Sequence, residues 1–201
     1  MLTDFHLDAL KELVNTGMGK AASALNELLD SFIVLQVPAI SLVNAETLRE
    51  GFGELNDARL SCVQLGFSGA FSGMAALVFP PQSAVALVSA LTCEDPDTPY
   101  LDAVMAGTLN EVGNIVINGV IGTLGNILTQ PFDFSLPNYI EGKLSDLLKG
   151  ATTIDRSVAL LIRTHFNVQD REIEGNIFLI FELKSFDCLL SAIDNLCQTA
   201  S

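Results

Sequence analysis

A carboxylate and a carboxamide recur at the same spacing in two places along the chain. Glu12 and Asn15 stand three residues apart, and Glu111 and Asn114 repeat the pair 99 residues later. Residues at this spacing lie on one face of a helix. Each pair therefore presents an acid and an amide side by side, and Asp8 lies one turn before the first pair on the same side.

These residue types favour the positioning of a water molecule over covalent catalysis. A carboxamide both donates and accepts hydrogen bonds, so it can orient a water for attack on a phosphoryl group. Phosphoryl transfer depends mainly on positioning and charge compensation, and a partner protein could carry the metal and the phosphate. General acid/base chemistry would use two carboxylates, Asp8 and Glu12, but the second pair has Gly107 at the matching position.

The surroundings of the two pairs distinguish them from an ordinary surface. A single Glu–Asn pair on a helix is usually only solvated. Here a proline follows each asparagine at the same distance, Pro38 after Asn15 and Pro137 after Asn114. The repetition of the whole pattern favours a functional site in each half of the chain.

Both motifs belong to a longer internal repeat. An offset of 99 residues aligns five identities: Glu12 with Glu111, Asn15 with Asn114, Leu25 with Leu124, Leu29 with Leu128 and Pro38 with Pro137. An offset of 102 aligns five more: Gly73 with Gly175, Leu77 with Leu179, Phe79 with Phe181, Ser83 with Ser185 and Leu87 with Leu189. Two ordered blocks indicate an internal duplication. We expect a single domain made of two homologous halves, about 1–97 and 98–201.

Each half is predicted to contain a long helix, an extended run, a hairpin and a short closing helix. Apolar residues recur at three- and four-residue steps from Phe5 to Leu29 and from about Leu101 to Leu128. Strand-like runs cover 59–67, 71–79, 157–166 and 172–183, and the short helices cover 81–93 and 184–198. This order predicts an α+β, pseudo-twofold fold in which long helices pack on an antiparallel or mixed β-sheet.

Prolines and glycines add detail to that fold. Pro38 and Pro137 stand in extended apolar runs, which predicts edge strands or breaks between strands. Glycine is unfavourable inside a helix unless another backbone comes close. The helical glycines therefore predict close packing of the two long helices; they are Gly17, Gly19, Gly107, Gly113, Gly119, Gly122 and Gly125.

The pattern Asp8-x3-Glu12-x2-Asn15-x22-Pro38 resembles the signature of the CheC family of CheY-phosphate phosphatases, within the CheC/CheX/FliY superfamily. The stretch that begins at Glu111 and reaches Pro137 resembles the family's second copy of the motif. The resemblance covers essentially the whole chain. CheX carries one motif in a shorter chain, and FliY adds a further domain, so CheC is the better match.

The resemblance implies a substrate and a mechanism. The substrate would be a phosphorylated CheY-like response regulator. Asn15 and Asn114 would position the hydrolytic water, and Glu12 and Glu111 would anchor the regulator by pairing with its active-site lysine. The chain would need no cofactor of its own, because the bound regulator would supply the Mg²⁺.

The same resemblance assigns supporting positions and leaves two other functions open. Asp8, Pro38 and Pro137 would support the sites. A non-catalytic module that binds CheY, similar to the middle domain of the flagellar switch protein FliM, is one alternative, although that domain lacks the Glu-x2-Asn motif. Regulation of a CheD-type deamidase is the other.

Composition excludes several other classes of protein. The chain has 201 residues, 24 acidic and 10 basic, and 49% of its residues are hydrophobic. That is too much apolar material for a disordered chain, and the net charge of −14 without Lys/Arg clusters argues against a nucleic-acid partner. The four cysteines lack Cys-x2-Cys spacing, which argues against zinc and for a reducing compartment.

One uncharged stretch, 112–132, is long enough to span a bilayer. It contains four amide side chains, which are costly in hydrocarbon: Asn114, Asn118, Asn126 and Gln130. We interpret the stretch as a helix buried in protein and expect no insertion into a membrane. Together with the cysteines, this predicts a cytoplasmic location.

Overall fold

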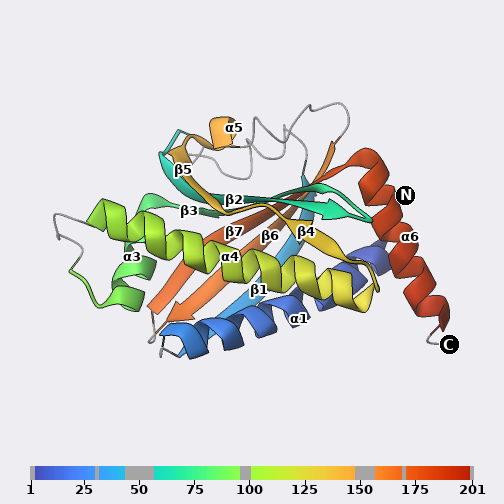
Figure 1. Ribbon diagram of the computed structural model, residues 1–201, viewed down its shortest axis with the longest axis horizontal. Helices are drawn as coiled ribbons and strands as arrows, with labels where there is room; N and C mark the ends of the chain where they lie inside the picture. The colour runs from blue at the N-terminus through green and yellow to red at the C-terminus, as the bar shows by residue number, and fades with distance from the viewer. Residues whose placement is uncertain are drawn as a thin grey trace.

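A seven-stranded sheet organises the residues that the computed structural model describes, which are 3–29, 32–43, 57–95, 101–147, 157–168 and 171–199 (Figure 1). Across the sheet the strands follow the order β1 (Ile33–Val43), β6 (Ser157–Val168), β7 (Arg171–Glu182), β3 (Gly73–Phe79) and β2 (Leu60–Gly69). The short strands β4 (Phe132–Phe134) and β5 (Asn138–Gly142) both pair with β2. All of these pairings are antiparallel.

Helices cover one face of the sheet (Figure 1). The two long helices, α1 (Asp4–Leu29) and α4 (Leu101–Ile127), lie side by side, and α3 (Pro81–Thr92) and α6 (Leu183–Thr199) flank them. A one-turn helix, α5 (Leu144–Leu147), lies on the opposite face, where its two leucines join a second apolar cluster. The predicted α+β fold, with long helices packed on a sheet, is confirmed.

The two halves of the chain exchange their outer strands. Among the described strands, β1 of the first half pairs with β6 of the second, and β5 of the second half pairs with β2 of the first. At the centre of the sheet Ala76 on β3 stands opposite Phe178 on β7, and the same two residues correspond at the offset of 102. A pseudo-twofold axis therefore passes between them, as the duplication predicts. The proposed boundary of the halves, near residue 97, lies outside the described residues.

The helices and strands expected from the sequence are present, with ends that differ by a few residues. Helix α3 stops one residue earlier than predicted, because Cys93 adopts a left-handed backbone conformation with φ of 57°. Helix α5 was not predicted, because four residues are too few to show a helical periodicity.

Both prolines interrupt strand pairing, as expected. The register between β1 and β6 shifts between Gln36 and Ala39, and Pro38 lies at this irregularity. Pro137 lies between β4 and β5. Proline has no N–H to donate to a neighbouring strand, so an edge strand and a break are the places that accept it.

Glycine brings the backbones of α1 and α4 together at one point. A Cβ atom added to Gly17 would lie 2.7 Å from Cα of Val120 and 2.8 Å from the carbonyl oxygen of Gly119. The predicted close approach is confirmed for this pair of glycines. It is wrong for three others on the two helices, around which an added Cβ meets no atom within 4 Å: Gly19, Gly107 and Gly122.

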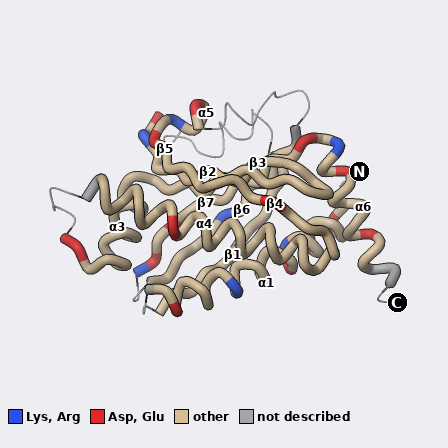
Figure 2. The backbone as a smooth tube through the Cα atoms, viewed as in Figure 1, with Lys and Arg blue, Asp and Glu red and all other residues tan. Residues whose placement is uncertain are grey.

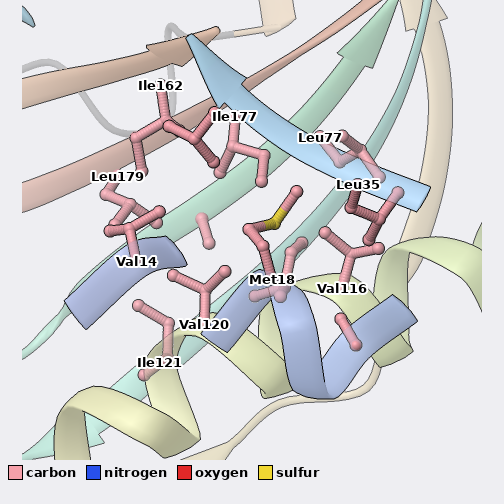
Figure 3. Packing of buried hydrophobic residues seen from close by; sticks show 14 of the residues in the cluster. Val14, Met18, Leu35, Leu77, Val116, Val120, Ile121, Ile162, Ile177 and Leu179 are labelled. Carbon is pink, nitrogen blue, oxygen red and sulfur yellow. The ribbon is translucent and has the colours of Figure 1, made fainter. Parts of the chain in front are cut away.

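The layer between the helices and the sheet holds the main core. Figure 3 shows Val14 and Met18 of α1 beside Val116 and Val120 of α4, with the side chain of Leu77 on β3 facing them from the sheet. Each of these five side chains is at most 1% exposed. Apolar residues at helical spacing therefore fix which side of α1 and of α4 is left to face solvent.

By length and composition alone, the segment Ala103–Ile127 of α4 could cross a membrane. In the structure it packs against α1 and against strands of the sheet, and its inner side chains are fully buried, Ile117 and Ile121 among them. The buried core helix of a soluble protein passes the same test, and the interpretation of α4 as a helix packed within protein is confirmed.

Burial of Cys62 should make its thiol less reactive than the exposed thiols of the chain. Loss of hydration raises the pKa of the Cys62 thiol from 9.0 to about 12, against a smaller lowering by a hydrogen bond to Gln64. In the unfolded chain the thiol ionises near pH 9, so its contribution to stability is complete below that pH and declines as the pH rises towards 12. Cys93 and Cys188 are exposed.

We therefore expect Cys62 to be protected from thiol reagents in the folded protein. In a variant with the other three cysteines replaced by serine, an alkylating reagent at pH 8 should modify Cys62 only at the rate of unfolding. A matched variant that retains Cys188 alone should react at the rate of a free thiol. Rapid modification of Cys62 under native conditions would contradict the burial.

Candidate functional site

The first Glu–Asn pair lies on the outward side of α1. Leu10 and Val14 are each 1% exposed and face the core, whereas Glu12 and Asn15 are exposed. The hydroxyl of Thr16 donates to the backbone carbonyl of Glu12 at 3.0 Å. The periodicity of the helix thus places both functional groups of the first pair in solvent, as the sequence predicts.

The second pair lies on α4 and differs in its surroundings. Glu111 is exposed, whereas Asn114 is partly buried; the buried residues Val112 and Val116 face the core from the other side of the helix. The Nδ2 atom of Asn118, one turn further along, donates to Oδ1 of Asn114 at 2.8 Å. The second amide is therefore held by a neighbour before any partner arrives.

The two pairs lie apart, one on each of the two long helices. α1 and α4 run in opposite directions side by side (Figure 1) and meet at Gly17 and Val120. Measured from this contact, Asn15 and Asn114 are separated along the helices by about eight residues, or about 12 Å. Each pair therefore offers its own acid and its own amide.

The supporting positions lie on the helices that carry the pairs, or in and between strands that contact those helices. Asp8 is exposed on α1, one turn before Glu12, and its counterpart Gly107 is exposed on α4. Strand β1, which contains Pro38, packs beside α1, and strands β4 and β5, which flank Pro137, pack beside α4. The supporting roles of these three residues stay predictions.

Charge is distributed widely over the described residues (Figure 2). Acidic residues lie on helices α1, α4 and α6 and at the ends of strands, and the few basic residues are scattered among them. Within the described ranges, no group of three or more His, Cys, Asp and Glu side chains lies together in a way that could hold a metal ion.

The first of the two histidines holds two helices together. His6 is 6% exposed; its Nε2 atom lies 2.9 Å from Oδ1 of Asp194 and its Nδ1 atom 2.7 Å from the hydroxyl of Thr3. These contacts attach the start of α1 to α6. His165 lies half-buried on β6.

The sequence analysis missed one residue of the candidate site, Asn118. A signal was available, because Asn110, Asn114 and Asn118 recur at four-residue spacing on α4 and would share one face of the helix. The spacing alone does not show which of these amides touch. The hydrogen bond between Asn114 and Asn118 does.

Two family models match the chain, and each contains one of the two motifs. The model described as "CheC-like family" matches residues 5–42, and the model "Chemotaxis phosphatase CheX" matches residues 61–154. The chain is thus similar to the CheC-like family in its first part and to the chemotaxis phosphatase CheX in the part that follows. The matched ranges include Glu12 and Asn15 in one case and Glu111 and Asn114 in the other.

Two curated relatives that carry the CheC and FliY names are similar to the chain over most of its length. The CheY-P phosphatase CheC of Bacillus subtilis is 25% identical over 202 residues, which cover 93% of this chain and 93% of the relative. The flagellar motor switch phosphatase FliY of the same organism is 22% identical over 199 residues, or 96% of this chain and 50% of the relative. The chain thus spans half the length of that FliY.

Solved structures share the fold. FliY of Thermotoga maritima superposes with a TM-score of 0.76 at 15% identity, over 98% of this chain and 99% of that one. The FliM middle domain from H. pylori gives a TM-score of 0.68 at 9% identity, over 95% and 99%. CheX in a complex with CheY, BeF3 and Mg²⁺ from Borrelia burgdorferi gives 0.53 at 21% identity, over 83% and 96%.

Proposed function

We propose that this CheC-like chain is a cytoplasmic protein phosphatase that hydrolyses the aspartyl phosphate of a CheY-like response regulator of chemotaxis. The observation that carries the proposal is the repeated Glu–Asn pair, in which Glu12, Asn15 and Glu111 are exposed and Asn114 is partly exposed on α1 and α4. Relatives named as CheY-P phosphatases, and a structural neighbour solved with CheY, support the same function.

The amides would act on the attacking water. Asn15 or Asn114 accepts a hydrogen bond from the water and donates one to it or to the phosphoryl group, which fixes the line of attack on phosphorus. The water forms the new P–O bond, the bond between phosphorus and the aspartyl oxygen breaks, and phosphate and a free carboxylate result. The regulator supplies the Mg²⁺ that compensates the charge on the phosphoryl oxygens.

The carboxylates would hold the regulator in place. Glu12 and Glu111 are exposed one turn from their amides, so a cationic side chain at the rim of the regulator's site can pair with either of them. The acid then sets the orientation of the regulator relative to the amide. Because the pairs lie on different helices, each site works with its own acid.

A second function is a non-catalytic switch module. The likeness to the FliM middle domain favours it, because that fold match covers 95% of this chain. Such a module would bind the regulator and leave the lifetime of its phosphate unchanged. The two Glu–Asn pairs favour catalysis over this alternative.

The direct test compares the decay of a phosphorylated CheY-type regulator with and without the purified chain. We expect the chain to accelerate loss of the phosphoryl group roughly tenfold or more at saturation, because positioning a water removes much of the entropic barrier. Radiolabel on the regulator would measure the decay. Binding of the regulator without faster decay would contradict the phosphatase and favour the switch module.

A further inference from the structure

We propose that Asn118 is a positioning residue for Asn114, and that it makes the second site the more active of the two. This inference rests on the proposed phosphatase function and assigns a difference between its two sites. Three observations carry it: a hydrogen bond, an unpaired buried oxygen, and the absence of a matching amide at the first site.

The hydrogen bond constrains the amide that would act on water. Nδ2 of Asn118 donates to Oδ1 of Asn114 at 2.8 Å, and both residues lie half-buried on the same face of α4. With one lone pair of Oδ1 occupied, the Asn114 amide has fewer orientations open to it than a free side chain. Its Nδ2 atom remains as a donor, and Oδ1 keeps a second lone pair, so the amide can still both donate to and accept from a water.

The carbonyl oxygen of the Asn118 side chain is left in an unfavourable position by this arrangement. Its Oδ1 atom is buried and has no hydrogen-bond partner within the described part of the chain. An unpaired buried amide oxygen is unfavourable, and asparagine is a poorer helix former than alanine. Stability alone would therefore favour alanine at residue 118, whereas the contact with Asn114 accounts for an amide.

The first site has no equivalent contact. At the offset of 99 the counterpart of Asn118 is Gly19, which has no side chain, and an added Cβ there meets no atom within 4 Å. Asn15 itself is exposed, and no side-chain hydrogen bond joins it to another described residue. The amide of Asn15 must be ordered at the moment the regulator binds, and that loss of freedom opposes the reaction at the first site.

The test isolates the second site by the Asn15→Ala substitution. In this background Asn118→Ala should lower kcat for loss of phosphate by about threefold to tenfold, the cost of ordering one short side chain. The concentration of regulator needed for half-maximal rate should stay unchanged, because Glu111 is intact. Gly122→Ala, also on α4 and facing open space, is the matched control and should leave kcat unchanged.

A second pair of variants transfers the contact to the first site. In an Asn114→Ala background, which leaves the first site alone, Gly19→Asn should raise kcat above that of Gly19→Ala. Both substitutions fill the same open position on α1 and improve the helix relative to glycine, so only the amide distinguishes them. Equal rates for the two variants would contradict the proposed role of the amide.

NMR relaxation tests the role of Asn118 without an assay of phosphatase activity. The side-chain ¹⁵NH₂ group of Asn114 should have a higher NMR order parameter than that of Asn15, and Asn118→Ala should lower it to the Asn15 value. Equal order parameters in the unchanged protein, or an unchanged kcat in the Asn15→Ala, Asn118→Ala variant, would overturn the inference. If the unchanged chain did not accelerate decay at all, the phosphatase itself would fail, and NMR alone would decide the positioning.

Discussion

A chain in which Asn15 and Asn114 are both replaced by alanine should no longer accelerate the decay of the phosphorylated regulator. Each substitution removes the only amide of its Glu–Asn pair, and alanine can neither donate to a water nor accept from it. The regulator's own slow hydrolysis should remain. Radiolabel decay over a series of chain concentrations measures the effect, and the slope of rate against concentration should fall to zero.

Each single variant should retain part of the activity, since the two amides lie on different helices. The larger loss is expected for Asn114→Ala, because Asn114 is the amide held by Asn118. Two exposed polar residues of the same helices, Ser23 and Asn126, provide a matched double-alanine control. An unchanged decay rate in the Asn15→Ala, Asn114→Ala chain would refute the proposed mechanism.

The fold itself should survive the double substitution. Asn15 is exposed and Asn114 half-exposed, and both alanines improve the helices that carry them. Circular dichroism and thermal unfolding should match the unchanged chain. A large fall in the unfolding temperature would assign the loss of activity to misfolding instead.

Substitution of two neighbouring glycines on α1 by alanine should change stability in opposite directions. At Gly17 a new Cβ meets backbone atoms of α4 at 2.7 and 2.8 Å, so the two helices must separate, and such overpacking costs about 1–3 kcal/mol. At Gly19 the Cβ enters open space, and the gain in helix propensity should stabilise the protein by up to about 1 kcal/mol.

Urea unfolding measures both effects in one series. The midpoint should fall for Gly17→Ala and rise for Gly19→Ala, with an unchanged dependence on urea concentration. The two positions share a helix and a residue type, so each is the control for the other. A stabilising Gly17→Ala would show that α1 and α4 can move apart without loss, which contradicts the close contact.

The elements of this fold were largely predictable, because they depend on local patterns. Apolar residues at three- and four-residue steps predicted α1 and α4, and the two hairpins followed from strand-like runs separated by short polar segments. The prolines were correctly placed at an edge and at a break, since a missing N–H has the same consequence in any sheet. Helix α5 escaped prediction, because one turn shows no period.

The candidate site was partly predictable for the same reason. Three-residue spacing places Glu12 beside Asn15, and Glu111 beside Asn114, on any regular helix. Composition could not show that Asn114 is half-buried, nor that Asn118 holds it, because both facts depend on how α4 packs. The glycines show the limit most clearly: Gly17 and Gly19 are two residues apart, and only Gly17 touches α4.

The amino-acid pattern thus settled the repeated helices, the hairpins and the two acid–amide pairs, since each is set by residues within a few positions along the chain. Packing settled the exchange of β1 and β5 between the halves, the contact of Gly17 with Val120, and the contact of Asn118 with Asn114 on a half-buried helix face. The physical reason is that burial and strand pairing are set by segments far apart in sequence. In this chain the two halves repeat one local pattern, but their surroundings differ: Asn15 is exposed, whereas Asn114 is partly buried and hydrogen-bonded to Asn118.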